Sequence, residues 1–198
     1  MAGMTAPAQW LVLWKVFYQP QSHREHRVRN WIFSVRSVTL WQNQMNVVLL
    51  EPEIPPNTGN VARLCAATRS MLHLIEPLGF KLDDAQLKRA GMDYWQHVEW
   101  HRWPDWKSFA EKIPANAKVW FIESGGPKIY SDAKFGAEDF LVFGRETAGL
   151  PKKLLEENHE RWLRIPMFNP RARSLNLSNC VALVLFEAMR QQGFRAAS

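Results

Sequence analysis

Cysteine is scarce: Cys65 and Cys180 are the two cysteines among 198 residues. No Cys-x-x-Cys pair and no paired Cys/His spacing occurs, which argues against a zinc site or a disulfide scaffold. The histidines of "HREH" at 23–26 are too isolated to form a metal site, so we expect no metal. Each cysteine lies in an apolar run of helical character. We therefore expect two small buried thiols in a reducing compartment.

The fingerprint loops of several enzyme classes are also missing. No Gly-x-Gly-x-x-Gly follows a predicted strand and no Gly-x-x-x-x-Gly-Lys-Ser/Thr occurs, so a dinucleotide-binding fold and a P-loop are unsupported. The absence of Gly-x-Ser-x-Gly excludes an esterase nucleophile elbow. The apolar run "WLVLWKVFY" at 10–18 is about half a membrane span, and it lacks the flanks of a signal peptide. We expect a cytoplasmic protein without a membrane partner.

Positive charge is concentrated at the N-terminus. The formal net charge is +6, of which residues 1–44 carry +4. The charged residues of this segment are Lys15, Arg24, Glu25, Arg27, Arg29 and Arg36. The remaining 154 residues carry only +2, so an anionic partner is allowed by the charge but not demanded by it.

Residues 1–44 differ from the rest of the chain in other ways. They hold four of the ten tryptophans, no glycine after Gly3, and no clean helical or strand period. A strong pattern begins at Met45. We interpret residues 1–44 as an N-terminal extension outside the domain, and residues 45–198 as the domain. The alternative is that the extension is a basic, aromatic arm that contacts RNA.

From Met45 onward, strand-like and helix-like segments alternate. Short apolar runs predict strands, and apolar residues at helical spacing predict helices. The predicted strands are 46–51, 71–77, 97–101, 118–124, 139–144 and 161–167. The predicted helices are 58–70, 82–91, 104–113, 151–158 and 176–192. This alternation predicts an α/β fold with a mostly parallel sheet and helices on both faces.

Four unusual loops each follow a predicted strand. They are "IPPNTGN" at 54–60, "SGGPK" at 124–128, "GRETAGLP" at 144–151 and "MFNPRARSLN" at 167–176. Because ligands bind at the carboxyl ends of parallel strands, we expect these loops to gather at one edge of the sheet. Their glycines, including Gly125 and Gly149, let backbone approach a ligand closely. Together with the carboxylate, asparagines and arginines of these loops, the glycines suit a flat ligand with polar edges, next to an anionic partner that arginine holds.

Three of these segments carry a family resemblance. "NTGNVARLC", "FGRETAGLP" and "IPMFNPRARSLNLSNCVALVLFE" resemble, in that order, the three motifs of the SPOUT methyltransferases. "LLEPEIPPNTGNVARLCAAT", "IEPLGF", "RAGMDYW" and "RIPM…RSLNLSN" resemble the tRNA (cytidine(34)-2'-O)-methyltransferase branch. The resemblance covers residues 45 to about 193. Two departures are Arg145, where close relatives can have proline, and "MFNPRARS", which is one residue longer than the branch pattern.

The resemblance implies an S-adenosyl-L-methionine-dependent enzyme with a deep trefoil knot near its C-terminus. It also implies a homodimer whose partner is tRNA, and methylation of the ribose 2'-hydroxyl at wobble position 34. The nucleotide would be a cytidine or modified uridine, in leucine isoacceptors. Two alternatives stay open: methylation of another tRNA or rRNA ribose, and a catalytically silent RNA-binding dimer.

The resemblance also implies two sets of site residues. The implied cofactor-binding residues are Ile122, Gly126, Gly144, Ile165, Met167, Ser174 and Leu175. The implied catalytic residues are Arg63, Asn57, Glu146, Ser174 and Asn176. The reaction is an in-line displacement by a weakly acidic hydroxyl, so alignment of the reacting groups can supply much of the rate.

Several of these residues have a simpler structural interpretation. Arg63 is either a solvated helix arginine or a clamp on the target nucleotide. A role as general base would need unusual desolvation, because guanidinium stays protonated in proteins. Asn57 and Asn60 are candidate helix caps, a role that for Asn57 is compatible with substrate contact. Glu146 is either an acid at a helix start or the group that orients Arg63 or another donor.

The C-terminal segment leaves similar alternatives. Ser174 and Asn176 could cap the last helix and also meet the substrate. Arg171 and Arg173 are either solvated or in contact with phosphate. The last helix has an apolar face formed by Val181, Leu185 and Met189, which serves packing or, as the resemblance implies, dimer contact.

Overall fold

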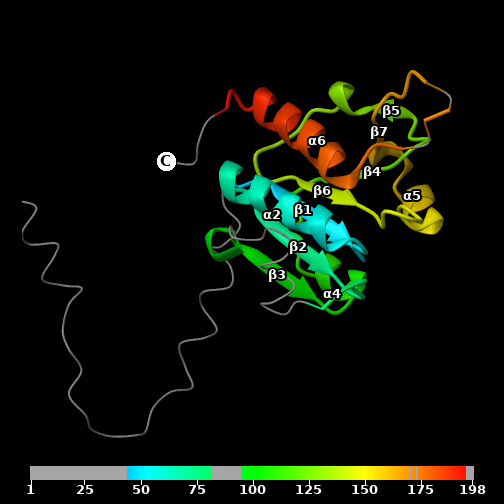
Figure 1. Cartoon of the computed structure of the whole chain (residues 1–198). Helices are drawn as coiled ribbons and strands as arrows, with labels where there is room; N and C mark the ends of the chain where they lie inside the picture. The colour runs from blue at the N-terminus through cyan, green and yellow to red at the C-terminus, as the bar shows by residue number, and fades with distance from the viewer. Residues whose placement is uncertain (1–43, 82–94, 170, 173, 195–198) are drawn as a thin grey trace, which may run out of the picture. The chain divides into compact units, whose positions relative to one another are not determined.

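The computed structural model describes residues 44–81, 95–169, 171–172 and 174–194 (Figure 1). The predicted helix at 82–91 lies outside the described residues. So do Arg173 and all but the last residue of the predicted extension.

The described residues form one sheet of seven parallel strands, in the order β3-β2-β1-β6-β4-β7-β5. The strands are β1 (Asn46–Leu50), β2 (Met71–Ile75), β3 (Trp100–Trp103), β4 (Val119–Ile122), β5 (Lys128–Ile129), β6 (Phe140–Phe143) and β7 (Trp162–Arg164). The prediction of an α/β fold around a parallel sheet is confirmed.

Helices cover both faces of this sheet. The α-helices are α2 (Pro55–Thr68), α4 (Trp106–Ala110), α5 (Lys152–Glu157) and α6 (Leu177–Gln191). Because side chains alternate along a strand, Val47 of β1 packs in the cluster that includes α2 and α6, and Val48 packs in the cluster that includes α4 and α5. Among the described residues there is no helix with the length and apolar character needed to cross a bilayer.

Helix α2 begins three residues earlier than the sequence predicts. Pro55 and Pro56 occupy its first turn, where backbone N–H groups have no partner within the helix, so the missing donors cost little. The N-cap is Ile54, which makes no side-chain capping bond. The hypothesis that Asn57 and Asn60 cap this helix is therefore wrong, because both lie inside it.

Other boundaries differ for local reasons. The strand predicted at 97–101 starts later, as β3, because residues Trp95–His97 form a 3-10 turn. Strand β5 was not predicted, because two residues carry no recognisable period. Asp105 caps α4 by accepting a 2.7 Å hydrogen bond from the Ser108 amide, so Pro104 precedes the cap and does not open the helix.

The strand order places the predicted loops together. Strands β1, β6, β4 and β7 are consecutive neighbours and all run parallel. The loops that follow them therefore leave the sheet at the same edge. From β1 the chain continues to β2 and then to β3 on one side of the sheet, whereas β4 to β7 all lie on the other side of β1. The carboxyl ends of β1 and β6 therefore lie at a topological switch point, where ligands bind in open α/β sheets.

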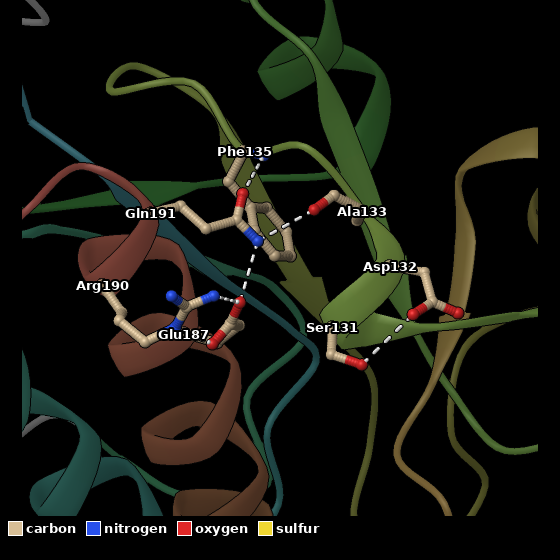
Figure 2. Close-up of polar contacts among 7 residues, drawn as sticks. All are labelled: Ser131, Asp132, Ala133, Phe135, Glu187, Arg190 and Gln191. Carbon is tan, nitrogen blue, oxygen red and sulfur yellow. Dashed lines mark hydrogen bonds and ion pairs between the residues drawn. The ribbon is translucent and has the colours of Figure 1, made fainter.

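The C-terminal end of α6 is anchored by Gln191 (Figure 2). Its amide nitrogen donates to the Ala133 carbonyl at 2.9 Å, and its amide oxygen accepts from the Phe135 backbone N–H at 3.0 Å. Glu187 accepts two 2.8 Å bonds from Arg190 and one of 2.9 Å from Gln191. The hydrogen bonds from Arg190, which have the largest effect, and from Gln191 lower the pKa of Glu187 to about 2, so the carboxylate stays ionised. The last turns of α6 are thereby tied to the segment that follows β5.

Candidate functional site

A cavity of about 580 Å³ lies at the carboxyl edge of the sheet. Its lining comes from within residues 54–57, 122–124, 143–149 and 165–180. All four unusual loops contribute to it or adjoin it, so the prediction that they gather at one edge is confirmed. The nine predicted site residues that the structure brings together there are Asn57, Ile122, Gly144, Glu146, Ile165, Met167, Ser174, Leu175 and Asn176.

The loop after β6 is tightly closed. Arg145 and Gly149 exchange two backbone hydrogen bonds, of 3.3 and 2.9 Å, and Gly149 has a φ of +67°. A Cβ at Gly144 would lie 2.2 Å from the carbonyl carbon of Gly149. Because real Cβ atoms do not approach backbone so closely, only glycine fits at position 144 without displacing the loop.

Glu146 joins this loop to the start of α2. Its carboxylate accepts backbone N–H bonds from Glu53 at 2.8 Å and Ile54 at 3.2 Å, and a 3.0 Å bond from the Asn57 side-chain amide. A negative charge is favourable at a helix N-terminus. Glu146 lies in no helix of its own, so the helix-start interpretation is wrong. The interpretation in which it orients another donor, here Asn57, is confirmed.

A chain of side-chain amides extends from Glu146 across the cavity. Asn57, which is 7% exposed, accepts a 2.8 Å bond at Oδ1 from Asn176 Nδ2. Asn176 in turn accepts a 2.9 Å bond at Oδ1 from the Ser178 amide and caps α6, as the sequence predicts. Ser174 lies two residues before this cap and is exposed on the cavity lining. The network therefore fixes polar groups from three separate loops.

Two further contacts between these loops were not predicted. Thr147 donates to the Glu53 carboxylate from its backbone N–H at 3.0 Å and from its hydroxyl at 2.7 Å. Arg145 forms an ion pair with Glu51, so the arginine that stands where relatives can have proline also fastens the loop to the end of β1. The only signal in the sequence was the pair of acids in "EPEIPP".

Glu123 is another cavity residue that sequence reasoning missed. Its Oε1 accepts from the Ser124 backbone N–H at 2.7 Å and from the Ser124 hydroxyl at 2.9 Å, and its Oε2 accepts from the Leu150 N–H at 3.0 Å. A Cβ at Gly149 would lie 2.1 Å from Oε2, so Gly149 leaves room for this carboxylate. An acid near the end of the strand predicted at 118–124 was the available signal.

Two predicted site residues lie outside the cavity lining. Arg63 is exposed on α2. Gly126 packs against β7: a Cβ there would lie 2.7 Å from the Leu163 carbonyl carbon, and its carbonyl accepts a 2.6 Å bond from Arg164. Gly126 thus has a packing reason to be glycine, and a cofactor role for it stays a prediction. Arg171 is exposed, which fits both of its interpretations.

The cysteines occupy different environments. Cys65 is fully buried in the core, and burial raises the pKa of its thiol. Cys180 is only half-buried and lines the cavity, so the expectation of two buried thiols is correct for Cys65 alone. Burial, with the charge of Glu123, raises the pKa of Cys180 to about 11, and the thiol stays protonated at neutral pH. Neither cysteine is therefore an activated nucleophile.

Metal-ligand chemistry has no visible support in this site. Over the described ranges, no group of three or more His, Cys, Asp or Glu side chains is arranged to hold a metal ion.

The Glu146 contacts predict a measurable stability effect. Glu146→Ala removes the acceptor of three hydrogen bonds, and bonds to charged groups contribute about 1–3 kcal/mol each when no solvent replaces them. We expect unfolding free energy to fall by about 1–3 kcal/mol in total, because Glu146 is partly accessible to water. Urea denaturation measures this. Glu157→Ala, which removes an exposed partner of Lys153 on α5, is the control and should have little effect.

An equal loss in Glu146→Ala and Glu157→Ala would contradict the view that Glu146 fastens the loop to α2. A loss confined to Glu146→Ala would support it.

Comparison with known proteins agrees with the fold. The chain belongs to the SpoU rRNA Methylase family, whose model matches residues 44–186. It is 52% identical over 155 residues to the tRNA (cytidine(34)-2'-O)-methyltransferase of Burkholderia cenocepacia, a match that covers 77% of this chain and 99% of that protein.

Two solved structures extend this comparison. One, reported as structural insights into the 2-OH methylation of C/U34 on tRNA, is 44% identical with a TM-score of 0.70, and the match covers 77% of this chain and 99% of that one. The other, an AdoMet-bound rRNA methyltransferase from Sinorhizobium meliloti, is 27% identical with a TM-score of 0.66 and covers 74% of this chain and 56% of that one.

Proposed function

We propose that this protein transfers a methyl group from S-adenosylmethionine to the ribose 2'-hydroxyl of nucleotide 34 of tRNA, a cytidine or modified uridine. The observation that carries the proposal is the match to the Burkholderia cenocepacia enzyme, at 52% identity over 99% of that protein. The family model matches residues 44–186, a range that includes every residue of the cavity lining. Leucine isoacceptors are the substrates we expect, and the cytoplasm is the compartment.

The cavity fits the proposed cofactor in size and chemistry. A volume of about 580 Å³ lies within the usual range of small-molecule sites. Ile122, Ile165 and Leu175 offer apolar surface to a flat base, and the closed loop at 144–149 lines the cavity beside them. When bound, S-adenosylmethionine supplies an electrophilic methyl group on a sulfonium. The residues proposed to hold it are Ile122, Gly144, Ile165, Met167, Ser174 and Leu175, with Gly126 supporting them from outside the lining.

The polar network suits a positioning role toward the target ribose. Glu146, Asn57 and Asn176 are hydrogen-bonded in series, so their orientations are set before a substrate arrives. Such preorganisation can lower a displacement barrier without a strong base. We propose that Ser174 contributes its hydroxyl to the same site, and that Arg63 clamps the target nucleotide from outside this cavity.

A homodimer would reconcile the position of Arg63 with that role, because the cavity it serves can belong to a second copy. Exposed apolar side chains on α6 support a dimer: Leu183 is 42% exposed and Phe186 is 47% exposed. Val181 and Leu185 are fully buried within their own chain and Met189 packs against the same core, so the packing interpretation of that face is the correct one.

We also propose that the C-terminal part of the chain forms a deep trefoil knot. Strand β7 follows β4, β5 and β6 in the chain, yet it pairs between β4 and β5. The segment that leaves β7 then contributes to the cavity beside the loop that leaves β6. This order supports a threaded arrangement, which is rare among folds.

Mapping of ribose methylation tests the proposed function. Unmodified tRNA from cells that lack this gene should gain a 2'-O-methyl group at nucleotide 34 when incubated with the protein and S-adenosylmethionine, as measured by mass spectrometry of nuclease fragments. The matched control is a tRNA with 2'-deoxyribose at nucleotide 34, which should gain none. Methylation of rRNA or of another tRNA ribose would favour the second candidate, and absence of any methylation would favour a silent RNA-binding dimer.

Removal of residues 1–44 should leave both folding and methyl transfer intact. The family model begins to match at residue 44, and the extension lacks the pattern that starts at Met45. We expect unfolding free energy to change by less than about 0.5 kcal/mol, as for surface changes remote from the core. Thermal melting and the methylation assay measure both quantities. Loss of activity with normal folding would instead support the RNA-contacting arm.

A further inference from the structure

The carboxylate of Glu123 lies in the cavity wall and forms no ion pair with another residue that the structure describes. Its three hydrogen bonds come from neutral donors, namely the Ser124 N–H and hydroxyl and the Leu150 N–H. None of the ion pairs formed within the described part of the chain involves it. These bonds hold the carboxylate in place, and none of their donors carries a positive charge.

The position of this charge matters because the cavity is recessed and lined partly by apolar groups. Glu123 and Cys180 both line it, on the loop after β4 and on α6. Burial, and after it the charge of Glu123, raises the pKa of the Cys180 thiol, so the carboxylate acts on another group of the cavity wall. Within such a site, electrostatic interactions are stronger than in bulk water. A ligand with a positive charge would therefore gain more here than a neutral ligand of the same shape.

We propose that Glu123 gives the cavity a preference for the cationic cofactor over its neutral-sulfur product. This inference rests on the proposed function. During methyl transfer the carbon–sulfur bond breaks, a carbon–oxygen bond forms to the ribose, the hydroxyl proton passes to solvent, and the sulfur loses its charge. S-adenosylmethionine and S-adenosylhomocysteine share the adenosine and the amino-acid ammonium, and they differ in the transferred methyl group and its sulfonium charge. A change in the ratio of their affinities between variants with and without a charge at position 123 therefore reports the effect of that charge. The fixed carboxylate would favour the first and ease release of the second.

A purely structural role for Glu123 makes a different prediction. The carboxylate also accepts a hydrogen bond from the Leu150 N–H, which helps to close the loop at 144–149. If that were its only effect, its loss would disturb the cavity wall for both ligands alike. A change in the ratio of the two affinities would not follow.

Calorimetric titration of the full-length protein with each ligand distinguishes these roles. In Glu123→Gln, which keeps an acceptor oxygen of similar reach, the dissociation constant of the product relative to that of the cofactor should fall by about tenfold. Glu123→Asp retains the charge and should retain most of the preference. Glu160→Gln removes the same charge from a side chain that is 98% exposed and outside the cavity lining, and should leave the ratio unchanged. Circular dichroism confirms that each variant is folded.

The outcomes are separable. A fall in the ratio for Glu123→Gln alone supports the proposal. An unchanged ratio, or equal weakening of both ligands, overturns it and leaves Glu123 as a support for the loop. Failure of the wild-type protein to bind either ligand would overturn the proposed function itself, and this inference with it.

Discussion

Gly144→Val should abolish binding of S-adenosylmethionine. Even the first side-chain carbon at this position would lie 2.2 Å from the Gly149 carbonyl carbon and 2.4 Å from the Leu150 nitrogen. The loop must therefore move, and it carries one wall of the cavity. We expect affinity to fall by more than about a hundredfold, equivalent to about 2.8 kcal/mol. Overpacking should also lower stability by about 1–3 kcal/mol, which leaves the protein folded.

Calorimetry with S-adenosylmethionine measures this loss of affinity. Two alanine variants, one inside the cavity and one outside it, test whether the loss is specific to position 144. Gly144→Ala should already impair binding severely. Gly136→Ala is the control, because a Cβ there meets a side-chain oxygen of Asp139 at 3.0 Å, away from the cavity. Near-normal binding by Gly144→Val would show that the cofactor does not occupy this cavity.

Arg63→Ala should leave cofactor binding intact and strongly impair turnover. The side chain is exposed and is not among the residues that line the cavity, so its removal should leave the walls of the cofactor site unchanged. Loss of one charge-assisted contact to the reacting nucleotide should cost on the order of 2–4 kcal/mol of transition-state stabilisation. Arg63→Lys should rescue activity poorly, because a point charge does not reproduce a bidentate guanidinium contact. Steady-state methylation kinetics and calorimetry measure the two effects.

Arg102→Ala is the matched control for charge. Arg102 lies on β3, at the edge of the sheet, and pairs with Glu76, which follows β2. Its removal should leave turnover unchanged. Full turnover by Arg63→Ala would show that Arg63 does not clamp the target nucleotide and is a solvated helix arginine.

Mixing the two inactive variants tests whether Arg63 acts across a dimer. If each site takes its cavity from one copy and its arginine from the other, a heterodimer of Arg63→Ala and Gly144→Val holds one intact site. Random reassortment of equal amounts yields about half heterodimer, as a two-fold interface allows. Activity should then reappear. A mixture that stays inactive despite measured subunit exchange would show that each site is built within one chain.

The agreement between sequence and structure differs from element to element. Strands β1 and β2 were predicted to within two residues, because each is a short segment dominated by apolar residues and followed by a glutamate and a proline. The start of α2 was misplaced because two prolines and two asparagines suggested a longer turn, whereas the prolines are accommodated in the first helical turn. Strand β5 exists only because β7 pairs with it, and nothing in its two residues predicts that pairing.

The sequence by itself determined which loops form the site. Each loop follows an apolar run, and in a parallel sheet the ends of such runs meet at one edge. The partners within the site were decided by the tertiary structure alone. Glu146 meets the Glu53 backbone 93 residues away, and Asn176 meets Asn57 across 119 residues. Contacts of this range leave no period in the sequence. They form only when the strand order brings β1, β6, β4 and β7 side by side. The same packing places Glu123, but not the exposed Arg63 of α2, in the wall of the cavity.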